Sequence, residues 1–147
     1  MAWEVEVTDE FREWWDALTE AEQVDVDSYV RQLEERGPML PYPYSSDVKQ
    51  SKHGHMRELR PQSGGSPLRV FYAFDPRRTA ILLIGGDKTG NDRFYEQFVP
   101  VADRLYDDHI REIKKTEREQ THGRSPSILG TSRQNVAGST KARRRKS

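Results

Sequence analysis

Two apolar segments joined by a short turn decide the fold, within the stretch LRVFYAFDPRRTAILLI at residues 68–84. Residues 68–74 are rich in β-branched and aromatic side chains, which favour strands. Residues 79–84 form a nearly continuous apolar run, which is typical of a strand buried on both faces. Between them, residues 75–78 (Asp-Pro-Arg-Arg) have turn composition. The stretch therefore predicts two neighbouring strands, the second of them in the interior of a sheet.

Further strands and loops are predicted on either side of this pair. Residues 3–7 alternate apolar and acidic side chains, the pattern of a half-buried strand. Residues 56–60 alternate again, and the Gly-Gly pair within residues 62–67 indicates a hairpin connection to the next strand. We expect residues 38–54, which hold three of the chain's eight prolines, to form a loop. The glycine-containing segment 85–91 is expected to be a flexible loop.

An N-terminal helical hairpin is predicted from its capping residues. Thr8 or Asp9 can cap a first helix, because a short side-chain oxygen accepts the free amide hydrogens of the first turn. Thr19 and Glu22 have the spacing of a capping box at the start of a second helix. Gly-Pro at residues 37–38 ends that helix.

A helical region is also predicted at the C-terminal end of the domain. Residues 94–115 carry apolar and aromatic side chains at helical intervals, and we expect Pro100 to force a break or a kink between a short first helix and a longer second one. The element order is then β-α-α-β-β-β-α. This order predicts an α+β domain with one small, mostly antiparallel sheet, packed by the helical hairpin and the C-terminal helix.

Length and composition favour one domain with a tail. The chain has 147 residues and no cysteine, which excludes disulfides, thiolate metal sites and thiol nucleophiles. We expect a domain at 1–118 and a disordered basic tail at 119–147, where few apolar residues are available to offset the entropy of ordering. The sequence has no signal-peptide pattern and no apolar stretch near the roughly 20 residues that span a bilayer. A cytoplasmic protein without a membrane partner is expected.

Charge is strongly segregated, although the formal net charge is zero. Residues 4–36 carry twelve acidic side chains against three arginines, a net of −9. Residues 37–95 carry nine basic side chains against five acidic ones, a net of +4, and residues 120–147 carry seven basic side chains and no acidic one. Such blocks would repel a polyanion at one end of the domain and attract it elsewhere.

Three ordered segments resemble the core of the RelE/HigB toxins, most closely their phage-derived Gp49-like branch: residues 56–60 (MRELR), 68–72 (LRVFY) and 81–88 (ILLIGGDK). In that family, a strand ending in Leu-Arg is followed by an Arg-x-x-Tyr strand, a hydrophobic strand and a loop with Gly and Lys. The resemblance covers residues 3–113. It implies a RelE-like fold and a ribosome-dependent endoribonuclease that cuts mRNA without metal or cofactor, inhibits translation and is silenced by a cognate antitoxin.

The resemblance also implies roles for individual residues. Arg60 matches an arginine that contacts phosphate, and Lys88 matches the basic position after the last strand. Tyr95 falls where these toxins place a tyrosine that stacks on a base or assists proton transfer. Lys49 and Lys52 lie where family members carry lysines that favour the 2′-oxyanion.

One position departs from the family pattern. RelE-type toxins have an arginine directly after the loop lysine, whereas Thr89 follows Lys88 in this chain. His53 or His55 is a substitute for the general acid, because histidine alone has an unperturbed pKa near neutrality.

Metal-free cleavage of RNA uses the 2′-hydroxyl of the substrate as nucleophile, so the protein must move protons and stabilise the charge of the phosphorane. Arginine suits the phosphate because its guanidinium donates two parallel hydrogen bonds. We expect phosphate binding by Arg60, Arg69 and Lys88, proton transfer by Lys49, Lys52 and His53 or His55, base binding by Tyr95, and further RNA contacts by Arg57, Arg143, Arg144 and Arg145.

Structural roles are the alternative for several of these residues. Arg57 or Arg60 could pair with Glu58 or with the acidic hairpin, and Lys88 could be solvated. Two histidines, at 53 and 55, without a carboxylate partner are a weak signal for a metal, so none is expected. Two other functions also stay open: a ParE-like gyrase inhibitor, which has the same fold, and a non-catalytic module that binds RNA or the ribosome.

Overall fold

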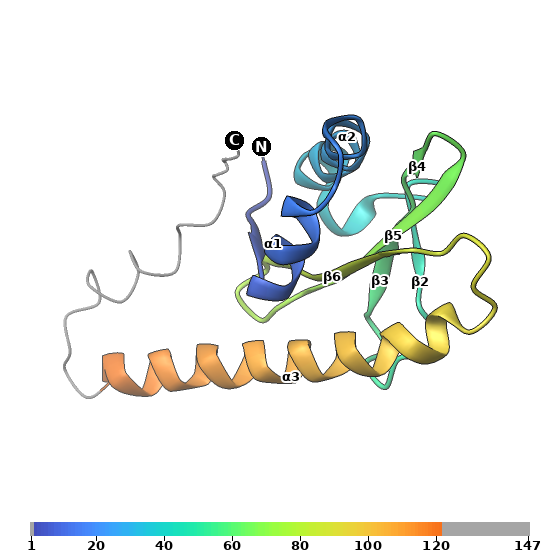
Figure 1. Cartoon of the computed structure of the whole chain (residues 1–147). Coiled ribbons are helices and arrows are strands. Elements are labelled where there is room, and N and C mark those ends of the chain that lie inside the picture. The colour runs from blue at the N-terminus through green and yellow to red at the C-terminus, as the bar shows by residue number, and fades with distance from the viewer. Residues whose placement is uncertain (1, 122–147) are drawn as a thin grey trace. The chain divides into compact units, whose positions relative to one another are not determined.

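The centre of the sheet is the antiparallel pair β5 (Ser66–Phe74) and β6 (Ala80–Asp87), as the sequence predicts. The computed structural model describes residues 2–121 and shows the pair crossing the middle of the fold (Figure 1). The carboxylate of Asp75 closes the connecting turn, since it accepts hydrogen bonds from the backbone amides of Arg77 (2.8 Å) and Thr79 (3.2 Å). Most residues of both strands are buried, which explains the nearly continuous apolar run of residues 79–84 in β6.

The other strands complete a sheet of six with the order β1-β6-β5-β3-β2. Strand β1 (Val5–Val7) is parallel to β6, whereas β3 (Arg57–Leu59) is antiparallel to β5 and β2 (Ser45–Asp47) is antiparallel to β3. The short β4 (Gln62–Ser63) pairs with the start of β5. The predicted α+β class with one mostly antiparallel sheet is therefore confirmed.

Two of these strands lie where the sequence predicts none. Strand β2 falls within residues 38–54, which we expected to be a loop throughout, and β4 falls within the predicted hairpin connection. Strand β2 consists of two serines and an aspartate, and its extended form depends on pairing with β3. A polar segment of this length has no hydrophobic pattern of its own.

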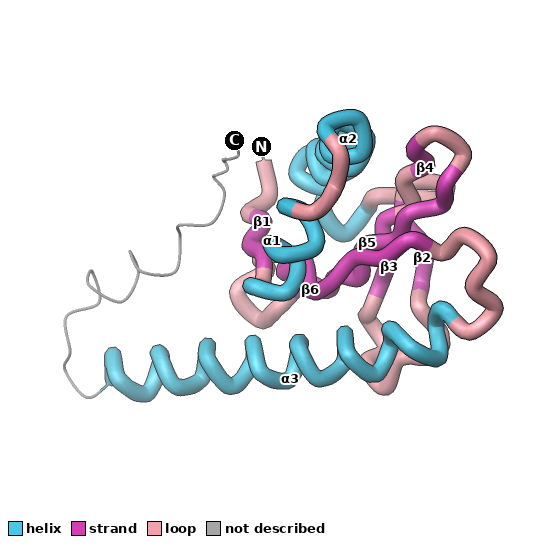
Figure 2. Tube along the Cα trace, viewed as in Figure 1, coloured by secondary structure: helices cyan, strands magenta, loops and turns pink. Residues whose placement is uncertain are grey.

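The N-terminal hairpin forms as predicted. Helix α1 (Asp9–Asp16) is capped by the Thr8 hydroxyl, which accepts a hydrogen bond of 2.9 Å from the amide of Phe11. Helix α2 (Glu20–Arg36) has the full capping box of Thr19 and Glu22, and it ends at Gly37, where the short 3-10 helix η1 (Gly37–Met39) begins. Figure 2 shows the two helices on one side of the sheet. Their buried side chains are Phe11, Val26 and Leu33. These pack on the residues of β5 and β6 that face the hairpin, Leu68, Val70, Tyr72, Ala80 and Leu82.

Helix α3 (Phe94–Thr121) runs through Pro100 without interruption, so the predicted division into two helices is wrong. Proline lacks the N–H that would bond to the carbonyl of Glu96, but packing on the sheet holds the turns on both sides of it. Before the proline, the rings of Phe94 and Phe98 stack with centroids 4.4 Å apart. After it, Ala102, Leu105 and Tyr106 are buried.

The chain divides into two units, Met1–Tyr106 and Asp107–Ser147. The sheet, the hairpin and the first turns of α3 all belong to the first unit. Helix α3 reaches Thr121, three residues into the segment expected to be a disordered tail, and the rest of that segment, with Arg143, Arg144 and Arg145, lies outside the described residues.

Two glycines let aromatic rings approach both faces of β6. A Cβ atom at Gly85 would lie 2.3 Å from the ring of Trp14 in α1, and one at Gly86 would lie 2.7 Å from the ring of Phe98 in α3. The expectation of a flexible loop at 85–91 is therefore wrong for its first three residues, which belong to β6. Neighbouring glycines face opposite sides of a strand, so the pair serves the hairpin on one face and α3 on the other.

We predict that Gly86→Ala lowers the free energy of unfolding by about 1–3 kcal/mol, because the added methyl group would overlap the Phe98 ring and force the helix to shift. Urea denaturation measures this change. Gly54→Ala is the matched control: nothing lies within 4 Å of its added Cβ, so it should change stability by less than about 0.5 kcal/mol. Equal effects of the two substitutions would contradict the packing role of Gly86.

Candidate functional site

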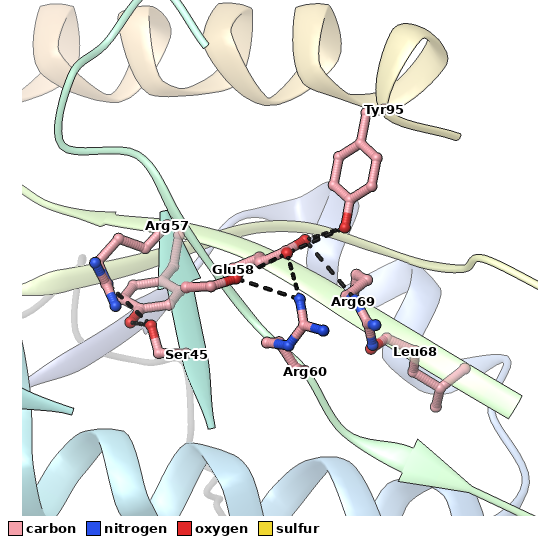
Figure 3. A network of polar contacts seen from close by, with 9 residues as sticks. Ser45, Arg57, Glu58, Arg60, Leu68, Arg69 and Tyr95 are labelled. Carbon is pink, nitrogen blue, oxygen red and sulfur yellow. Dashed lines mark hydrogen bonds and ion pairs between the residues drawn. The ribbon is translucent and has the colours of Figure 1, made fainter. Parts of the chain in front are cut away.

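A buried carboxylate, Glu58, brings together side chains from three elements (Figure 3). It projects from β3, and the Tyr95 hydroxyl at the start of α3 donates to its two oxygens at 2.8 and 3.0 Å. Arg60, directly after β3, donates to Oε2 at 3.0 Å, as does the Ser46 hydroxyl of β2. Arg69, on β5, places its Nε 3.9 Å from Oε1. We call Glu58, Arg60, Arg69, Tyr95 and the nearby Lys88 the Glu58 cluster.

Strand geometry explains why these residues meet. Side chains alternate across a strand, so Glu58 and Arg60 share one face of the sheet while Arg57 faces the other. Strand β5 pairs with β3 so that Phe71 lies opposite Glu58. Arg69, two residues before Phe71, lies on the same face of the sheet. The first turn of α3 packs on Phe71, whose ring meets the Tyr95 ring edge-on with centroids 6.1 Å apart.

The two arginines of the cluster differ in depth. The Arg69 side chain is 5% exposed and donates to the carbonyl of Leu68 at 2.8 Å, and its Nε has no hydrogen-bond partner among residues 2–121. The Arg60 side chain is 24% exposed, so its guanidinium is available to a ligand from solvent. With Lys88, three cations oppose one carboxylate, which leaves a formal charge of +2 at one place on the fold. Such a site attracts an anion.

Tyr95 links the carboxylate to the remaining cation. Burial raises the pKa of the Tyr95 phenol, and the hydrogen bond to Glu58 raises it further, so the hydroxyl remains a proton donor near neutral pH. The Lys88 ammonium lies 5.3 Å from the centroid of the Tyr95 ring. Lys88 itself is fixed at the end of β6 by a 2.9 Å hydrogen bond from its amide to the carbonyl of Pro67. The structure thus brings four of the predicted site residues together: Arg60, Arg69, Lys88 and Tyr95.

The predicted RNA contact Arg57 belongs to a separate network. Its Nε donates to the Ser45 hydroxyl at 2.9 Å, and its guanidinium pairs with Asp47 on β2. The buried Ser45 hydroxyl also lies 2.6 Å from the hydroxyl of Tyr72. Arg57 therefore joins β2, β3 and β5 on the face opposite the Glu58 cluster.

The predicted basic loop lies further along α3. The Ser51 hydroxyl and the Lys52 amide donate to the carboxylate of Asp103, at 2.5 and 3.2 Å, and Lys49 is exposed in the preceding turn. Asp103 lies eight residues after Tyr95, which corresponds to about 12 Å along a helix. The backbone amide of Lys52 is therefore held about two helical turns beyond Tyr95, and Lys49 is exposed in the turn before it.

The two histidines of that loop form an aromatic group with Tyr106. His55 Nε2 lies 3.0 Å from the Tyr106 hydroxyl, and the ring centroids of His53 and Tyr106 are 4.9 Å apart. Partial burial, and to a smaller extent the neighbouring His53, lowers the pKa of His55, which favours its neutral form. Tyr106 is eleven residues after Tyr95, or about 16 Å along α3, so these rings are separate from the Glu58 cluster.

Glu58 is the functional candidate that the sequence analysis missed as a site residue. It appears there only as a possible partner of Arg57 or Arg60, and the structure shows that Arg60 pairs with it while Arg57 pairs with Asp47. A signal was present: an acidic residue in a short alternating strand, with an arginine on each side, is an expensive residue to bury unless it is paired.

Residues 2–121 contain neither a cluster of metal-binding side chains nor a membrane-spanning helix. No group of three or more histidine, cysteine or acidic side chains is placed to hold a metal ion there. In the same part of the chain, no helix is both long and apolar enough to cross a bilayer.

Comparison with known families defines the class of this protein. The family of phage-derived Gp49-like proteins matches residues 13–107, which is more than half of the chain and includes the whole Glu58 cluster. The chain therefore belongs to the phage-derived Gp49-like family.

Relatives from Mycobacterium tuberculosis (strain ATCC 25618 / H37Rv) narrow the class to the HigB toxins. A protein named as the toxin HigB3 is 42% identical over 92 residues, which cover 62% of this chain and 79% of the relative. A protein named as the toxin HigB2 is 36% identical over 105 residues, covering 70% of this chain and about half (52%) of the relative. The expected membership of the RelE/HigB toxin family is thereby confirmed.

Two solved structures are similar at low sequence identity. A mutant of Escherichia coli toxin RelE in the free state has a TM-score of 0.49 at 10% identity, covering 65% of this chain and 94% of that chain. The archaeal RelE–RelB complex from Pyrococcus horikoshii OT3 contains a chain with a TM-score of 0.46 at 15% identity, covering 61% and 99%. Both are similarities of backbone arrangement.

We predict that Glu58→Ala destabilises the fold by about 3–5 kcal/mol, because it leaves the buried Arg69 without an opposing charge. Glu58→Gln should cost less, since it retains the volume and an oxygen that accepts from Tyr95. Urea denaturation measures both. The matched control is Glu96→Ala, which removes an exposed partner of Arg93 and should change stability by less than about 0.5 kcal/mol. Similar stabilities for the Glu58 and Glu96 variants would show that the buried carboxylate does not hold the cluster together.

Proposed function

We propose that this toxin is a ribosome-dependent mRNA endoribonuclease that uses no metal ion and inhibits translation. The observation that carries the proposal is the Glu58 cluster, in which solvent-accessible cations surround a hydrogen-bonded tyrosine and carboxylate. Membership of the RelE/HigB family supports the choice of RNA as the substrate. The fold by itself does not select this function, because the same fold is used for others.

The reaction we propose is an attack by the 2′-oxygen of the substrate on the adjacent phosphorus. The new bond joins the 2′-oxygen to phosphorus, and the bond from phosphorus to the 5′-oxygen breaks, leaving a cyclic phosphate and a free 5′-hydroxyl. Arg60 and Lys88, the accessible cations, bind the phosphate and stabilise the negative charge that develops in the transition state. Arg69 does not contact the substrate in this scheme; its buried charge holds the Glu58 carboxylate in place.

Tyr95 and Glu58 are suited to remove the proton of the 2′-hydroxyl together. Glu58 is the only proton acceptor among the charged members of the cluster, but its side chain is 4% exposed and does not reach solvent directly. Tyr95 is half-buried and donates its hydroxyl hydrogen to Glu58. In the proposed relay, the phenol oxygen takes the 2′-hydroxyl proton while the phenol proton passes to Glu58, and the departing 5′-oxygen takes a proton from water.

The loop residues expected to move protons are not needed for this scheme. Lys52, His53 and His55 contact residues 103–106 of α3, on the order of 12–16 Å along the helix from Tyr95, and Lys49 lies in the preceding turn. We propose instead that Lys49 and Lys52 contact the RNA or the ribosome away from the reacting phosphate. This placement leaves the relay of Tyr95 and Glu58 as the proton acceptor.

We predict that expression of the wild-type chain in cells produces mRNA 5′ ends within translated reading frames, and that Arg60→Ala/Lys88→Ala abolishes them. Removal of one preorganised electrostatic contact in a catalytic site typically lowers the rate by about 10²–10³-fold, and two are removed here. The measurement is a map of mRNA 5′ ends after induction. The matched control, Arg12→Ala/Arg31→Ala, removes two exposed arginines from the acidic hairpin and should cleave as the wild type does.

The same map, together with assays for DNA damage and for ribosome binding, distinguishes the nuclease from the other two functions. Tyr95→Phe retains the ring but removes the relay, so it should also lose the new 5′ ends. Growth arrest with intact messages for both the wild type and the variants would overturn the nuclease proposal. DNA damage would then indicate a gyrase inhibitor, and ribosome binding without cleavage would indicate a non-catalytic module.

We further propose that the cognate antitoxin neutralises the Glu58 cluster with an acidic segment that covers Arg60 and Lys88. Arg60→Ala/Lys88→Ala should then weaken antitoxin binding by at least about tenfold, because two charge-assisted contacts are lost. Isothermal titration calorimetry with the purified antitoxin measures this affinity, and Arg12→Ala/Arg31→Ala again serves as the control. An unchanged affinity of the cluster variant would place the antitoxin on another surface.

A further inference from the structure

An exposed aromatic residue, Tyr42, stands beside the cationic cluster. Tyr42 is 69% exposed, and it is one of three large apolar side chains so exposed among residues 2–121, with Val24 and Met39. Of the three, only Tyr42 is aromatic. Its ring faces the Arg60 guanidinium, with Cζ 5.2 Å from the ring centroid. The accessible phosphate-binding arginine of the cluster therefore has a solvent-exposed ring as its direct neighbour.

Backbone hydrogen bonds order the turn that presents Tyr42. Tyr42 lies between two prolines, which restrict the chain, and the amides of Tyr44 and Ser45 both donate to the carbonyl of Pro41, at 3.0 and 3.1 Å. The Arg60 amide donates to the carbonyl of Tyr44 at 3.0 Å. The turn that presents Tyr42 and the strand end that presents Arg60 are thus joined by a backbone hydrogen bond. A ligand that uses both side chains therefore meets a backbone that is already ordered.

The two aromatic residues next to the cluster are not equivalent. Tyr95 donates its hydroxyl to Glu58, and its ring packs edge-on against Phe71 and Phe94. Each ring has a cation over one face, Lys88 over Tyr95 and Arg60 over Tyr42, so the difference between them lies in burial. Tyr42 has most of its surface open to solvent. The geometry of Tyr95 suits the proton relay, and the residue whose ring is open to a nucleobase is Tyr42.

We propose that Tyr42 is a base-binding residue of the site: it stacks on the nucleobase next to the phosphate that Arg60 holds. This inference rests on the proposed function, since it takes single-stranded RNA as the ligand. Exposed aromatic rings beside arginines are the means by which proteins bind unpaired nucleotides, because the ring stacks on the base while the guanidinium binds the backbone. Stacking uses the π-face of a base, so Tyr42 contributes affinity with little sequence preference.

The test separates the effect of the aromatic ring of Tyr42 from the effects of side-chain size and of the hydroxyl group. The probe is a short 2′-O-methyl oligoribonucleotide containing 2-aminopurine, which cannot be cleaved because it has no free 2′-hydroxyl. Tyr42→Leu should bind it roughly 5- to 150-fold more weakly than the wild type and should lose the fluorescence quenching that stacking produces. Tyr42→Phe and Tyr42→Trp should bind and quench as the wild type does. Val24→Ala removes an exposed apolar side chain from the acidic helix α2 and should change neither signal.

The outcomes distinguish this inference from the proposed nuclease activity. Equal affinity and quenching for Tyr42→Leu and the wild type would overturn the role of Tyr42, whatever the cleavage maps show. A loss of antitoxin affinity in Tyr42→Leu with unchanged RNA binding would also overturn it, and would assign the ring to the protein partner. Weaker binding of Tyr42→Leu to the probe, in a protein that cleaves no message, would support the base-binding role while the nuclease proposal fails.

Discussion

The buried carboxylate of Glu58 is the interaction on which the rest of the site depends. Without it, Arg69 would be a cation buried at 5% exposure beside a second guanidinium, and the like charges would separate or draw in water. With it, Arg60, Arg69 and Tyr95 converge on two oxygen atoms from two strands and a helix. The same contacts fix the start of α3 on the sheet. The carboxylate also limits the site, because a phosphate that approaches Arg60 competes with Glu58 for the same guanidinium. A cluster with a net charge of +2 allows that competition, whereas one-to-one pairing would not favour the ligand.

The local sequence pattern predicted most of the fold. It failed where the structure of a residue depends on partners far away in the sequence. The β5–β6 pair and the capped hairpin follow from apolar periodicity and capping residues, which act within a few positions of the chain. Strand β2 could not be predicted, because three small polar residues become a strand only through β3. Gly85 and Gly86 indicated a loop by composition, yet they are strand residues because Trp14 and Phe98 occupy the space of their side chains. In each case tertiary packing overrides local propensity.

The sequence predicted the cations of the candidate site but not the buried carboxylate at its centre. Arg60, Arg69, Lys88 and Tyr95 were selected from the family pattern and from their positions near the ends of elements, and these four residues do lie together. Glu58 could not be assigned its place from sequence, because its partners come from β2, β5 and α3, up to 37 positions away. The loop with Lys49, Lys52 and the two histidines precedes the cluster in sequence, but the sheet directs it towards residues 103–106 of α3. Proximity along the chain was a poor guide here, since β3 carries the chain from that loop to the cluster.

The sheet also separates the opposite charges of the sequence. Residues 4–36, with a net charge of −9, form β1 and the hairpin, whose buried side chains pack on one face of the sheet. The Glu58 cluster lies on the other face, where α3 begins (Figure 3). A polyanion is repelled from the hairpin and attracted to the cluster, so its path over the fold is restricted. Residues 37–44, which carry no charge, contact both regions: the Tyr44 ring packs on Tyr29 of α2, and the Tyr42 ring lies beside Arg60. A nucleic acid strand that left the proposed phosphate site in that direction would meet no cation from residues 37–44, and the group that this segment would offer it is the aromatic ring of Tyr42. Stacking on a base, and not a second phosphate contact, is therefore the interaction that this edge of the site can provide.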